Sequence, residues 1–300
     1  MRPKDPGKTA RMRRELREEL KGKKTVVTIY IILRVLVILT MVAQFLNGNF
    51  ENVFLCILTL LLLLAPAFIQ VQFRIELFPL PTVIERRVRI DLPDTLEIII
   101  LLFIFSAEIL GEIQAYYTYF HGWDTMLHTL NGFLCAAIGF SLVDLFNRNE
   151  RFSLSLSPVF MAIVAFCFSM TIGVLWEFFE CIMDSFFLLD MQKDTIVHDI
   201  STVMLDPTGG NKITAIRGIT DVIVVAGGKE IPLGGYLDIG LLDTMKDLFV
   251  NFIGAFVFSI IGYFYVKNRG RGRFARRFIP KVLPEEPVQA DEEDSGPDHT

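Results

Sequence analysis

The sequence predicts an all-α integral membrane protein: a six-transmembrane-helix bundle with a small extracytoplasmic cap made of a loop and a β-hairpin. Of its 300 residues, 52% are hydrophobic and only 21% are charged, and the mean hydropathy is +0.46. The apolar residues fall in runs of about 20, the length that crosses ~30 Å of hydrocarbon. This composition excludes an ordinary soluble domain, which needs less apolar surface.

We expect six spans, and the first needs a separate argument because it resembles a signal peptide. Its apolar stretch exceeds the usual ~7–15 residues and no small-residue cleavage pattern follows, so we predict a membrane anchor. In the second span Pro66 removes one backbone hydrogen bond, which neighbouring helices can replace. The predicted spans are residues 25–46, 51–72, 95–117, 123–146, 157–187 and 240–266.

Basic residues are divided unequally between the two sides of these spans. The termini and the 73–94 and 147–156 connections together carry 23 Lys and Arg. The 188–239 connection carries four, and the two short turns carry none. Because Lys and Arg stay in the cytoplasm, we expect both termini on the cytoplasmic side of the membrane, with residues 25–266 forming the membrane domain.

The two termini are predicted to be cytoplasmic segments outside the bundle. Residues 1–24 are basic, and the mixed charges of Arg2–Lys24 at helical spacing favour a surface helix. Residues 267–300 are first basic and then acidic, which is typical of a disordered tail. A basic block beside an apolar segment indicates anionic lipid rather than nucleic acid as its neighbour.

The 188–239 connection is polar and rich in glycine, and we expect it to be an ordered cap outside the membrane. Residues 221–225 and 229–231 flank a Gly-containing turn, which predicts a β-hairpin. A connection this long is usually functional or disordered. The four cysteines lie elsewhere, inside apolar segments and without a CxxC pair, so we interpret them as small core residues.

Ionisable residues inside four of the spans require an explanation, because an Asp at the centre of a spanning helix costs about 2.5–3.5 kcal/mol. They recur three or four residues apart, so each set lies on one helix face. In outward-running spans they are near the C-terminal end, and in inward-running spans near the N-terminal end. All four sets should therefore converge in a shallow pocket that opens to the outside. The sets are Glu108 and Glu112; Asp124 and His128; Glu177, Glu180 and Asp184; and Asp243, Asp247 and Asn251.

For several of these residues a purely structural explanation remains open as an alternative to a common pocket. Acids near helix ends can simply lie at the level of the headgroups, where exposure costs little. Asn251 can be an interhelical hydrogen-bonding residue, and Gly132 and Gly254 can allow close packing. Arg34, in the middle of the first span, must reach the interface or pair with an acid, and Lys246 can neutralise part of the cluster. Tyr116, Tyr117, Tyr119, Trp123 and Trp176 are typical of an interfacial aromatic belt.

Three motifs together resemble the YjdF-like family of bacterial inner-membrane proteins and, more distantly, the VanZ-like membrane proteins. They are the run from Asp124 to Phe133, the Trp176–Glu180 segment with Asp184, and the run from Asp243 to Gly254. The resemblance covers about residues 95–266. It implies a prokaryotic plasma-membrane protein with no established biochemical activity. VanZ-like relatives are associated with glycopeptide resistance at the cell envelope, and the 188–239 insertion departs from their compact pattern.

The first function that this pattern favours is an enzyme acting on a lipid or lipid-linked envelope substrate at the outer leaflet. The candidate cofactor is a divalent metal ion, Mg²⁺, Ca²⁺ or Mn²⁺ on an oxygen-rich set or Zn²⁺ on histidine and carboxylates. The metal would polarise an ester or phosphate while a carboxylate acts as base. The candidate catalytic residues are His128, Glu177, Glu180 and Asp247. The candidate metal ligands are His128, Glu177 and Asp247, with His198 and Asp199 as further donors. The candidate substrate-binding residues are Asp124, Asn251, Asp243, Asp184, Glu108 and Glu112.

Two other function classes are compatible with the same residues. Buried carboxylates and Asn are typical of an ion-coupled transporter, although the chain shows no internal repeat. A non-catalytic envelope factor would use the polar cluster only to hold its helices together and the cap to bind a partner. No Ser-His-Asp, HExxH or P-loop pattern points to a standard hydrolase or nucleotide site.

Overall fold

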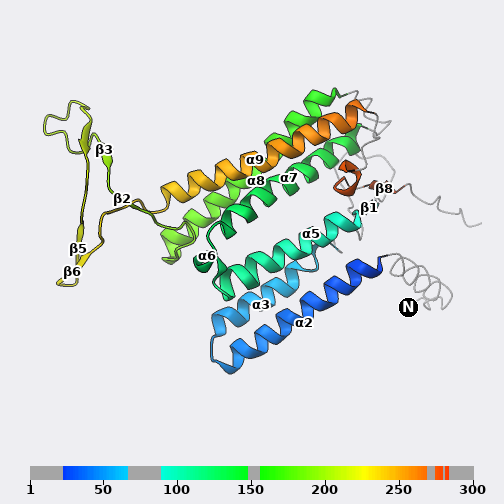
Figure 1. The fold of residues 1–300 in the computed structure, drawn as a ribbon, viewed down its shortest axis with the longest axis horizontal. Coiled ribbons are helices and arrows are strands. Elements are labelled where there is room, and N and C mark those ends of the chain that lie inside the picture. The colour runs from blue at the N-terminus through cyan, green and yellow to red at the C-terminus, as the bar shows by residue number, and fades with distance from the viewer. Residues whose placement is uncertain (1–22, 67–88, 148–155, 269–273, 280, 284–300) are drawn as a thin grey trace, which may run out of the picture. The chain divides into compact units, whose positions relative to one another are not determined.

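The computed structural model describes residues 23–66, 89–147, 156–268, 274–279 and 281–283, and it is mostly helical (Figure 1). The predicted surface helix over Arg2–Lys24 lies outside these residues except for its last two. The chain divides into two compact units, one of Met1–Ala115 with Arg273–Thr300 and one of Tyr116–Gly272. We describe each unit by itself.

The first unit is a layer of apolar helices. Helix α2 (Lys24–Leu46) and helix α3 (Phe50–Leu62) form a hairpin through a three-residue turn. Asn49 begins α3, because its side-chain oxygen accepts a hydrogen bond from the backbone N–H of Asn52 at 3.2 Å. Helix α5 (Asp94–Phe105) packs against both. A salt bridge links the start of α2 to α5, because Lys23 Nζ lies 3.0 Å from Glu97 Oε2.

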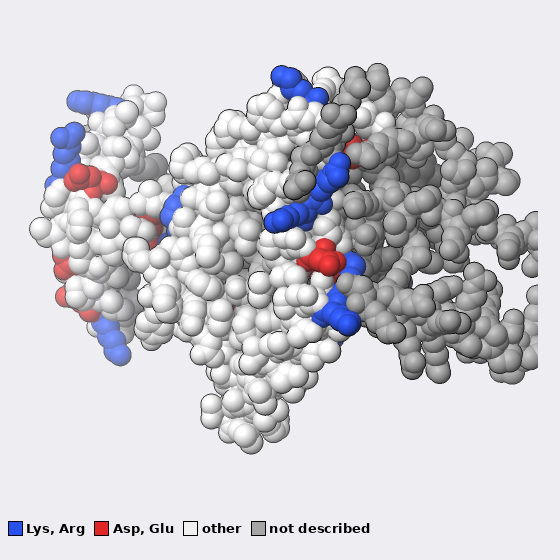
Figure 2. Space-filling model, turned by 45° about the vertical axis from the view of Figure 1, so that its right-hand side comes forward, with Lys and Arg blue, Asp and Glu red and all other residues white. Residues whose placement is uncertain are grey.

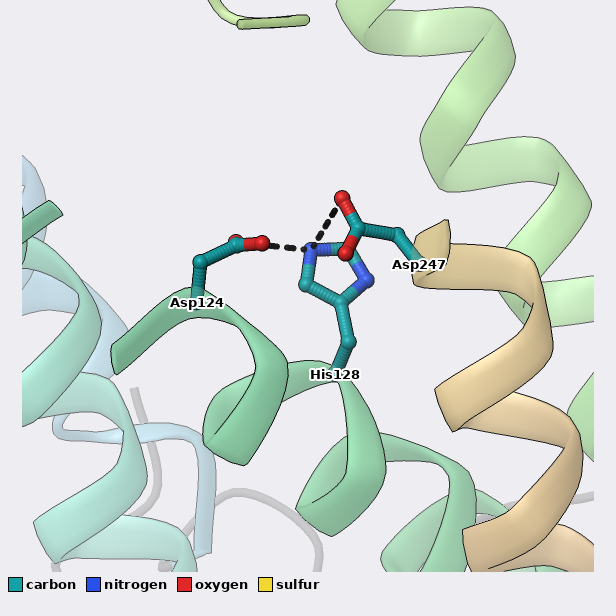
Figure 3. A group of neighbouring side chains, drawn as sticks. All are labelled: Asp124, His128 and Asp247. Carbon is teal, nitrogen blue, oxygen red and sulfur yellow. Dashed lines mark ion pairs between the residues drawn. The ribbon is translucent and has the colours of Figure 1, made fainter. Parts of the chain in front are cut away.

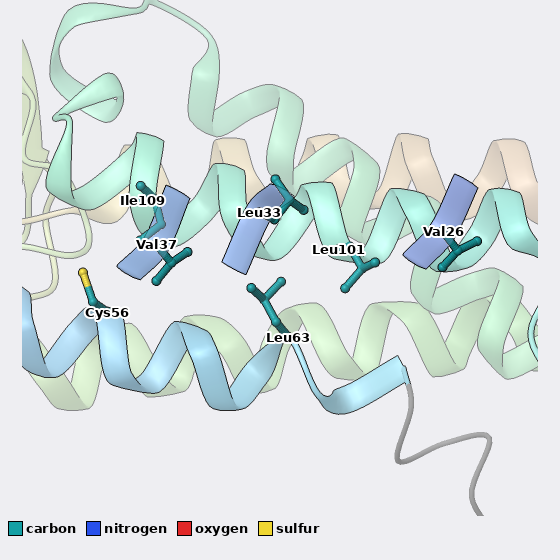
Figure 4. Close-up of a cluster of buried hydrophobic side chains, with 7 residues drawn as sticks. All are labelled: Val26, Leu33, Val37, Cys56, Leu63, Leu101 and Ile109. Carbon is teal, nitrogen blue, oxygen red and sulfur yellow. The ribbon is translucent and has the colours of Figure 1, made fainter. Parts of the chain in front are cut away.

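The interior of this unit is an apolar cluster contributed by α2, α3, α5 and the segment that follows α5 (Figure 4). None of its members carries a formal charge, so burial of apolar surface and close packing hold these helices together. The cluster consists of Val26, Leu33, Val37, Cys56, Leu63, Leu101 and Ile109. The prediction that the four cysteines are small core residues is confirmed for Cys56 but is wrong for Cys167 and Cys181, which are exposed.

A π-helix, η1 (Ser106–Ile113), continues α5 without a break. Its five-residue hydrogen bonding extends to Gln114, whose backbone N–H donates to Ile109 O at 3.0 Å. The helix ends at Ala115, which has a positive φ of 56°. The sequence predicted one α-helix over 95–117, so the change to π geometry over Glu108 and Glu112 was not foreseen.

The segment after the last long helix has structure that the sequence did not predict. Strand β1 (Arg89–Asp91) pairs antiparallel with β8 (Lys281–Leu283), and the short helix η2 (Ala275–Arg277) precedes β8. The proposed tail over 267–300 therefore contains ordered residues up to 283. A two-stranded ribbon depends on residues far apart in the sequence, and basic composition alone gives no signal for it.

The second unit is a three-helix bundle of α7 (Trp123–Asn147), α8 (Pro158–Phe187) and α9 (Leu241–Lys267), preceded by the short helix α6 (Tyr116–Tyr119). Ser157 caps α8 by accepting the N–H of Phe160 at 3.2 Å, and Pro158 occupies its first turn.

Residue pairs along this bundle fix the directions of its helices. On α7 and α9, His128 lies near Asp247 and Phe140 near Phe258, so numbers rise together and the helices are parallel. On α7 and α8, His128 lies near Glu177, whereas Ser169 Oγ donates to Gly132 O at 2.7 Å. Residue numbers thus rise along α7 in the direction in which they fall along α8, so α8 is antiparallel to α7 and α9.

Glycines allow α7 and α9 to approach closely. A Cβ on Gly132 would lie 2.1 Å from the backbone oxygen of Asn251, and one on Gly254 would lie 2.0 Å from that of Thr129. These distances leave no room for any side chain. The structure thus supports the packing role of both glycines.

The 188–239 connection forms three short antiparallel ribbons beyond the ends of α8 and α9 (Figure 1). The predicted hairpin is confirmed, because β5 (Ile223–Ala226) pairs with β6 (Lys229–Pro232) around Gly227 and Gly228. Both glycines have positive φ, 58° and 75°, as a two-residue hairpin turn requires. The other ribbons pair β2 (Ile196–Val197) with β7 (Tyr236–Leu237), and β3 (Ile200–Thr202) with β4 (Thr214–Ile216).

Four of the described helices are long and apolar enough to cross a membrane. They match four predicted spans within two residues: Lys24–Leu46, Trp123–Asp144, Pro158–Phe187 and Leu241–Lys267. Within the predicted second span, α3 covers Phe50–Leu62, and residues 67–72 lie outside the described part of the chain. The predicted third span is divided between α5 and η1. Much of the surface visible in Figure 2 carries no Lys, Arg, Asp or Glu, and large apolar side chains such as Phe54 and Phe178 are 70% and 60% exposed. Such a surface suits lipid.

Candidate polar centre between three helices

Polar side chains from α7, α8 and α9 meet around the imidazole of His128. Its Nε2 lies 3.3 Å from Asp124 Oδ1 and 3.9 Å from Asp247 Oδ2, as Figure 3 shows. Its Nδ1 lies 3.9 Å from Glu177 Oε1. We call Asp124, His128, Glu177, Lys246 and Asp247 the polar centre.

The polar centre is largely shielded, and three of its oxygen atoms lack hydrogen bonds. The side chains of Asp247 and Glu177 are only 2% and 5% exposed, and that of His128 is 13% exposed. Within the described part of the chain, the buried atoms Asp124 Oδ2, Glu177 Oε2 and Asp247 Oδ1 have no hydrogen-bonding partner. A buried oxygen left unsatisfied costs about 1–3 kcal/mol, and more on a charged group. Such atoms call for a proton, a water molecule or a cation.

Lys246 supplies one positive charge on the other side of the two aspartates. Its Nζ lies 2.7 Å from Asp243 Oδ1, 3.2 Å from Asp124 Oδ2 and 3.6 Å from Asp247 Oδ1. The bond to Asp243 is a hydrogen bond, whereas Asp124 Oδ2 is close without hydrogen-bond geometry. One lysine and one histidine therefore face four carboxyl groups, including that of Glu177.

Glu180 lies one turn beyond Glu177 on α8 and is also buried. The indole Nε1 of Trp176 donates to its Oε1 at 2.8 Å, which fixes the carboxyl group against its own helix. Trp176, expected in an interfacial aromatic belt, thus also bonds to Glu180, a contact that was not predicted. The i, i+4 spacing of the two residues was the available signal.

Asp184 and Asp243 connect the helix ends to the 188–239 connection. Both oxygens of Asp184 accept backbone N–H groups, from Met191 at 2.6 Å and from Gln192 at 2.8 Å. Asp243 Oδ2 accepts the N–H of Lys193 at 2.9 Å. Both aspartates therefore fasten the 188–239 connection to the helix ends by hydrogen bonds. Their predicted role in substrate binding stays a prediction.

Asn251 is fully buried and bonds across the bundle. Its Nδ2 donates to Ser169 O at 3.5 Å on α8, and its Oδ1 accepts from Asn131 Nδ2 at 3.4 Å on α7. Its side chain fills the space beside Gly173, where an added Cβ would lie 2.6 Å from Nδ2. The interhelical alternative for Asn251 thus has direct structural support.

The remaining predicted residues belong to other parts of the chain. Glu108 and Glu112 are on η1 in the first unit. Arg34 Nη1, in that same unit, donates to the hydroxyl of Tyr30 at 2.5 Å, one turn earlier on α2. In the connection, His198 Nδ1 is 2.7 Å from Ile219 O, and Asp199 Oδ1 accepts the N–H of Gly218.

The arrangement has the donor chemistry of a small metal site. One ligand atom each from Asp124, His128 and Asp247 lies within 4.8 Å of the other two. The ligands predicted from the sequence were His128, Glu177 and Asp247, whereas the atoms that lie together belong to Asp124, His128 and Asp247. Glu177 lies instead on the Nδ1 side of the ring, where metal-binding histidines usually have a carboxylate that orients them.

Fold and site together define a helical membrane protein with a polar centre buried among its helices. The chain belongs to the family described as "Predicted membrane protein (DUF2238)", whose model matches residues 27–268. No curated protein and no solved structure matches the chain, so the comparisons give the family alone.

Proposed function

We propose that the polar centre binds a divalent cation and that the protein is a metal-assisted hydrolase or transferase acting on a lipid or lipid-linked envelope substrate. The observation that carries this proposal is the Asp124–His128–Asp247 set, together with the unsatisfied buried oxygens of Asp247 and Glu177. Carboxylate and imidazole ligands suit Mn²⁺, Mg²⁺ or Zn²⁺.

The proposed setting is the outer leaflet of a bacterial plasma membrane, with six spans and both termini in the cytoplasm. The distribution of Lys and Arg supports this orientation. The opposite direction of α8 relative to α7 and α9 agrees with it. A continuous α5–η1 helix over Asp94–Ile113 has 20 residues and would reach about 30 Å at ~1.5 Å per residue. The likeness to YjdF-like and VanZ-like proteins points to the same envelope setting.

An apolar groove supports a lipid as the substrate class. It has a volume of about 500 Å³ and runs between α7 and α9. Thr125 and Thr129, which line it, directly follow Asp124 and His128 in the sequence, and Gly254 lies one turn after Asn251. The groove has the size and apolar lining to hold a chain of methylene groups, and it follows the face of α7 next to the one that carries Asp124 and His128.

The chemistry follows from the positions of the carboxylates. A cation on Asp124, His128 and Asp247 would polarise a carbonyl or phosphoryl oxygen. Glu177 would hold the imidazole through Nδ1, and Glu180, whose Oε1 alone is bound by Trp176, is the candidate general base.

Metal binding by the purified full-length protein tests this proposal. We expect the wild type to bind Mn²⁺, and His128→Ala and Asp247→Asn to bind it at least about 100-fold more weakly, since even outer-shell partners are worth ~10–100-fold. His121→Ala is the matched control, because His121 is exposed and lies seven residues before His128. Equal affinity in all four proteins would refute the metal site.

A non-catalytic envelope factor is the second candidate, and the structural bonds of Asp184, Asp243 and Asn251 favour it. Complementation of a deletion strain under envelope stress separates the two. The enzyme requires His128→Ala to fail, whereas the structural factor requires it to succeed. Ion-coupled transport, the third possibility, would appear as H⁺ or Na⁺ flux in proteoliposomes that Asp247→Asn abolishes.

A further inference from the structure

Asp124 and Asp247 each present their two oxygens to two different groups, the imidazole of His128 and the ammonium of Lys246. Asp124 uses Oδ1 toward His128 Nε2 at 3.3 Å and Oδ2 toward Lys246 Nζ at 3.2 Å. Asp247 uses Oδ2 toward the same Nε2 at 3.9 Å and Oδ1 toward the same Nζ at 3.6 Å. The two carboxylates thus bridge the imidazole side and the ammonium side of the polar centre.

Two carboxylates that bridge two positions from different helices are the framework of a two-cation centre, in which the metal ions stand ~3.5–4 Å apart. On the imidazole side the framework offers a nitrogen and two oxygens. On the other side three oxygens converge, because Asp243 Oδ1 also lies 2.7 Å from Lys246 Nζ. Three carboxylate oxygens are a ligand set for a hard divalent cation.

We infer that the Lys246 ammonium occupies the second cation position of this framework, so that the polar centre takes one divalent cation instead of two. The inference rests on the proposed function, which places a divalent cation on the imidazole side. In this inference Lys246 sets the number of divalent cations that the polar centre binds.

The burial of Asp247 and the missing hydrogen bond at its Oδ1 are a second observation that supports this assignment. Its side chain is 2% exposed, and Oδ1, the oxygen that faces Lys246, is one of the buried atoms without a hydrogen bond among the described residues. An ammonium at 3.6 Å neutralises that oxygen only in part, whereas a coordinated cation would satisfy it. Lys246 itself is 46% exposed, so solvent can reach the position when the lysine is replaced.

Removal of the ammonium should therefore open a second metal position. In Mn²⁺ titrations of the full-length protein in detergent, we expect one ion per chain for the wild type and two for Lys246→Met. Two Mn²⁺ ions bridged by carboxylates are spin-coupled, so the second ion should also change the electron paramagnetic resonance spectrum. Lys246→Arg keeps the positive charge and should bind one ion.

Controls separate this inference from the proposed function. Lys193→Met removes a lysine from the connection and should leave one ion per chain, and Lys246→Gln repeats the test if Lys246→Met does not fold. One uncoupled ion per chain in both the wild type and the Lys246 variants would overturn this inference alone. Two ions in the wild type would overturn it as well. No bound ion in any of these proteins would overturn the proposed function and the inference together.

Discussion

The interiors of the two units differ although both are built from strongly apolar helices. In the first unit the buried cluster around Leu33 and Leu101 carries no formal charge. In the second unit Glu177, Glu180, Asp247 and Asn251 are buried among equally apolar helices.

The comparison indicates what polar residues do in the second unit. In the described part of the first unit an uncharged cluster fills the space between the helices, so buried carboxyl groups are not required to pack helices of this kind. Burying several of them costs free energy that a well-packed apolar core avoids. This difference is consistent with the functional role that we propose for the buried acids of α8 and α9, whereas the contacts of the glycines and Asn251 serve packing.

Truncating the apolar cluster gives the largest expected effect. Leu101→Ala should lower the free energy of unfolding by about 2–5 kcal/mol, because it leaves a cavity in a site that is 1% exposed. The neighbouring Leu102→Ala, at a position 43% exposed, is the control and should cost much less. Denaturation of the detergent-solubilised protein measures both. If both variants retain Mn²⁺ binding, the two units have separate tasks; loss of binding in Leu101→Ala would contradict that division.

Gly254→Ala tests the close approach of α7 and α9. Its Cβ would meet Thr129 O at 2.0 Å, so the helices must separate, at a cost of about 1–3 kcal/mol. The separation should also weaken Mn²⁺ binding, because His128 and Asp247 lie on these two helices. Phe256→Ala, on an exposed part of α9, is the control. Unchanged stability and metal affinity in Gly254→Ala would show that the contact is dispensable.

Glu177→Met tests whether a buried acid stabilises the bundle. We expect the free energy of unfolding to stay equal or to rise by about 1–3 kcal/mol, since an unsatisfied buried oxygen is removed. Mn²⁺ affinity should fall about 10–100-fold if, as we propose, the Glu177 carboxyl group 3.9 Å from Nδ1 positions His128 as a metal ligand. Thermal unfolding and metal titration of Glu177→Met and Glu177→Gln measure the two effects. A clear loss of stability in Glu177→Met would mean that the acid holds the helices together.

The smallest expected effect is a local pH dependence in the 188–239 connection. The backbone N–H of Lys212, with the hydroxyl and N–H of Thr208, lowers the pKa of Asp206 to about 2. The lowered pKa means that the ionised carboxylate stabilises this loop above its unfolded pKa of ~3.9, and that the effect is lost as the pH falls through about 2. The protection of the Lys212 amide against exchange, relative to its intrinsic rate at each pH, should fall over that range in the wild type. This change should disappear in Asp206→Asn, and its persistence there would assign it to another group.

Local patterns were enough to predict much of the second unit. The apolar runs predicted α7, α8 and α9 within one or two residues, because the length of a spanning helix is set by the bilayer. The two glycines at 227 and 228 predicted the β5–β6 turn, since few other residues adopt positive φ twice in succession. The three- and four-residue spacing placed each polar set on one helix face.

Other features depended on contacts between distant segments. The π geometry of η1 and the β1–β8 ribbon arise from hydrogen bonds that composition does not encode, and neither was predicted. The sequence also could not show that Asp184 accepts backbone N–H groups of the connection, or that Asp124 rather than Glu177 lies beside His128 Nε2 and Asp247.

The sequence by itself determined that this protein is a helical membrane protein with ionisable residues on the faces of its helices, because hydropathy and periodicity are properties of single segments. Only the tertiary structure decided which of those residues meet. The glycine contacts set how closely α7 and α9 approach, and that approach brings His128, Asp124, Asp247 and Lys246 together. Distances between side chains on separate helices follow from packing, which no single segment contains.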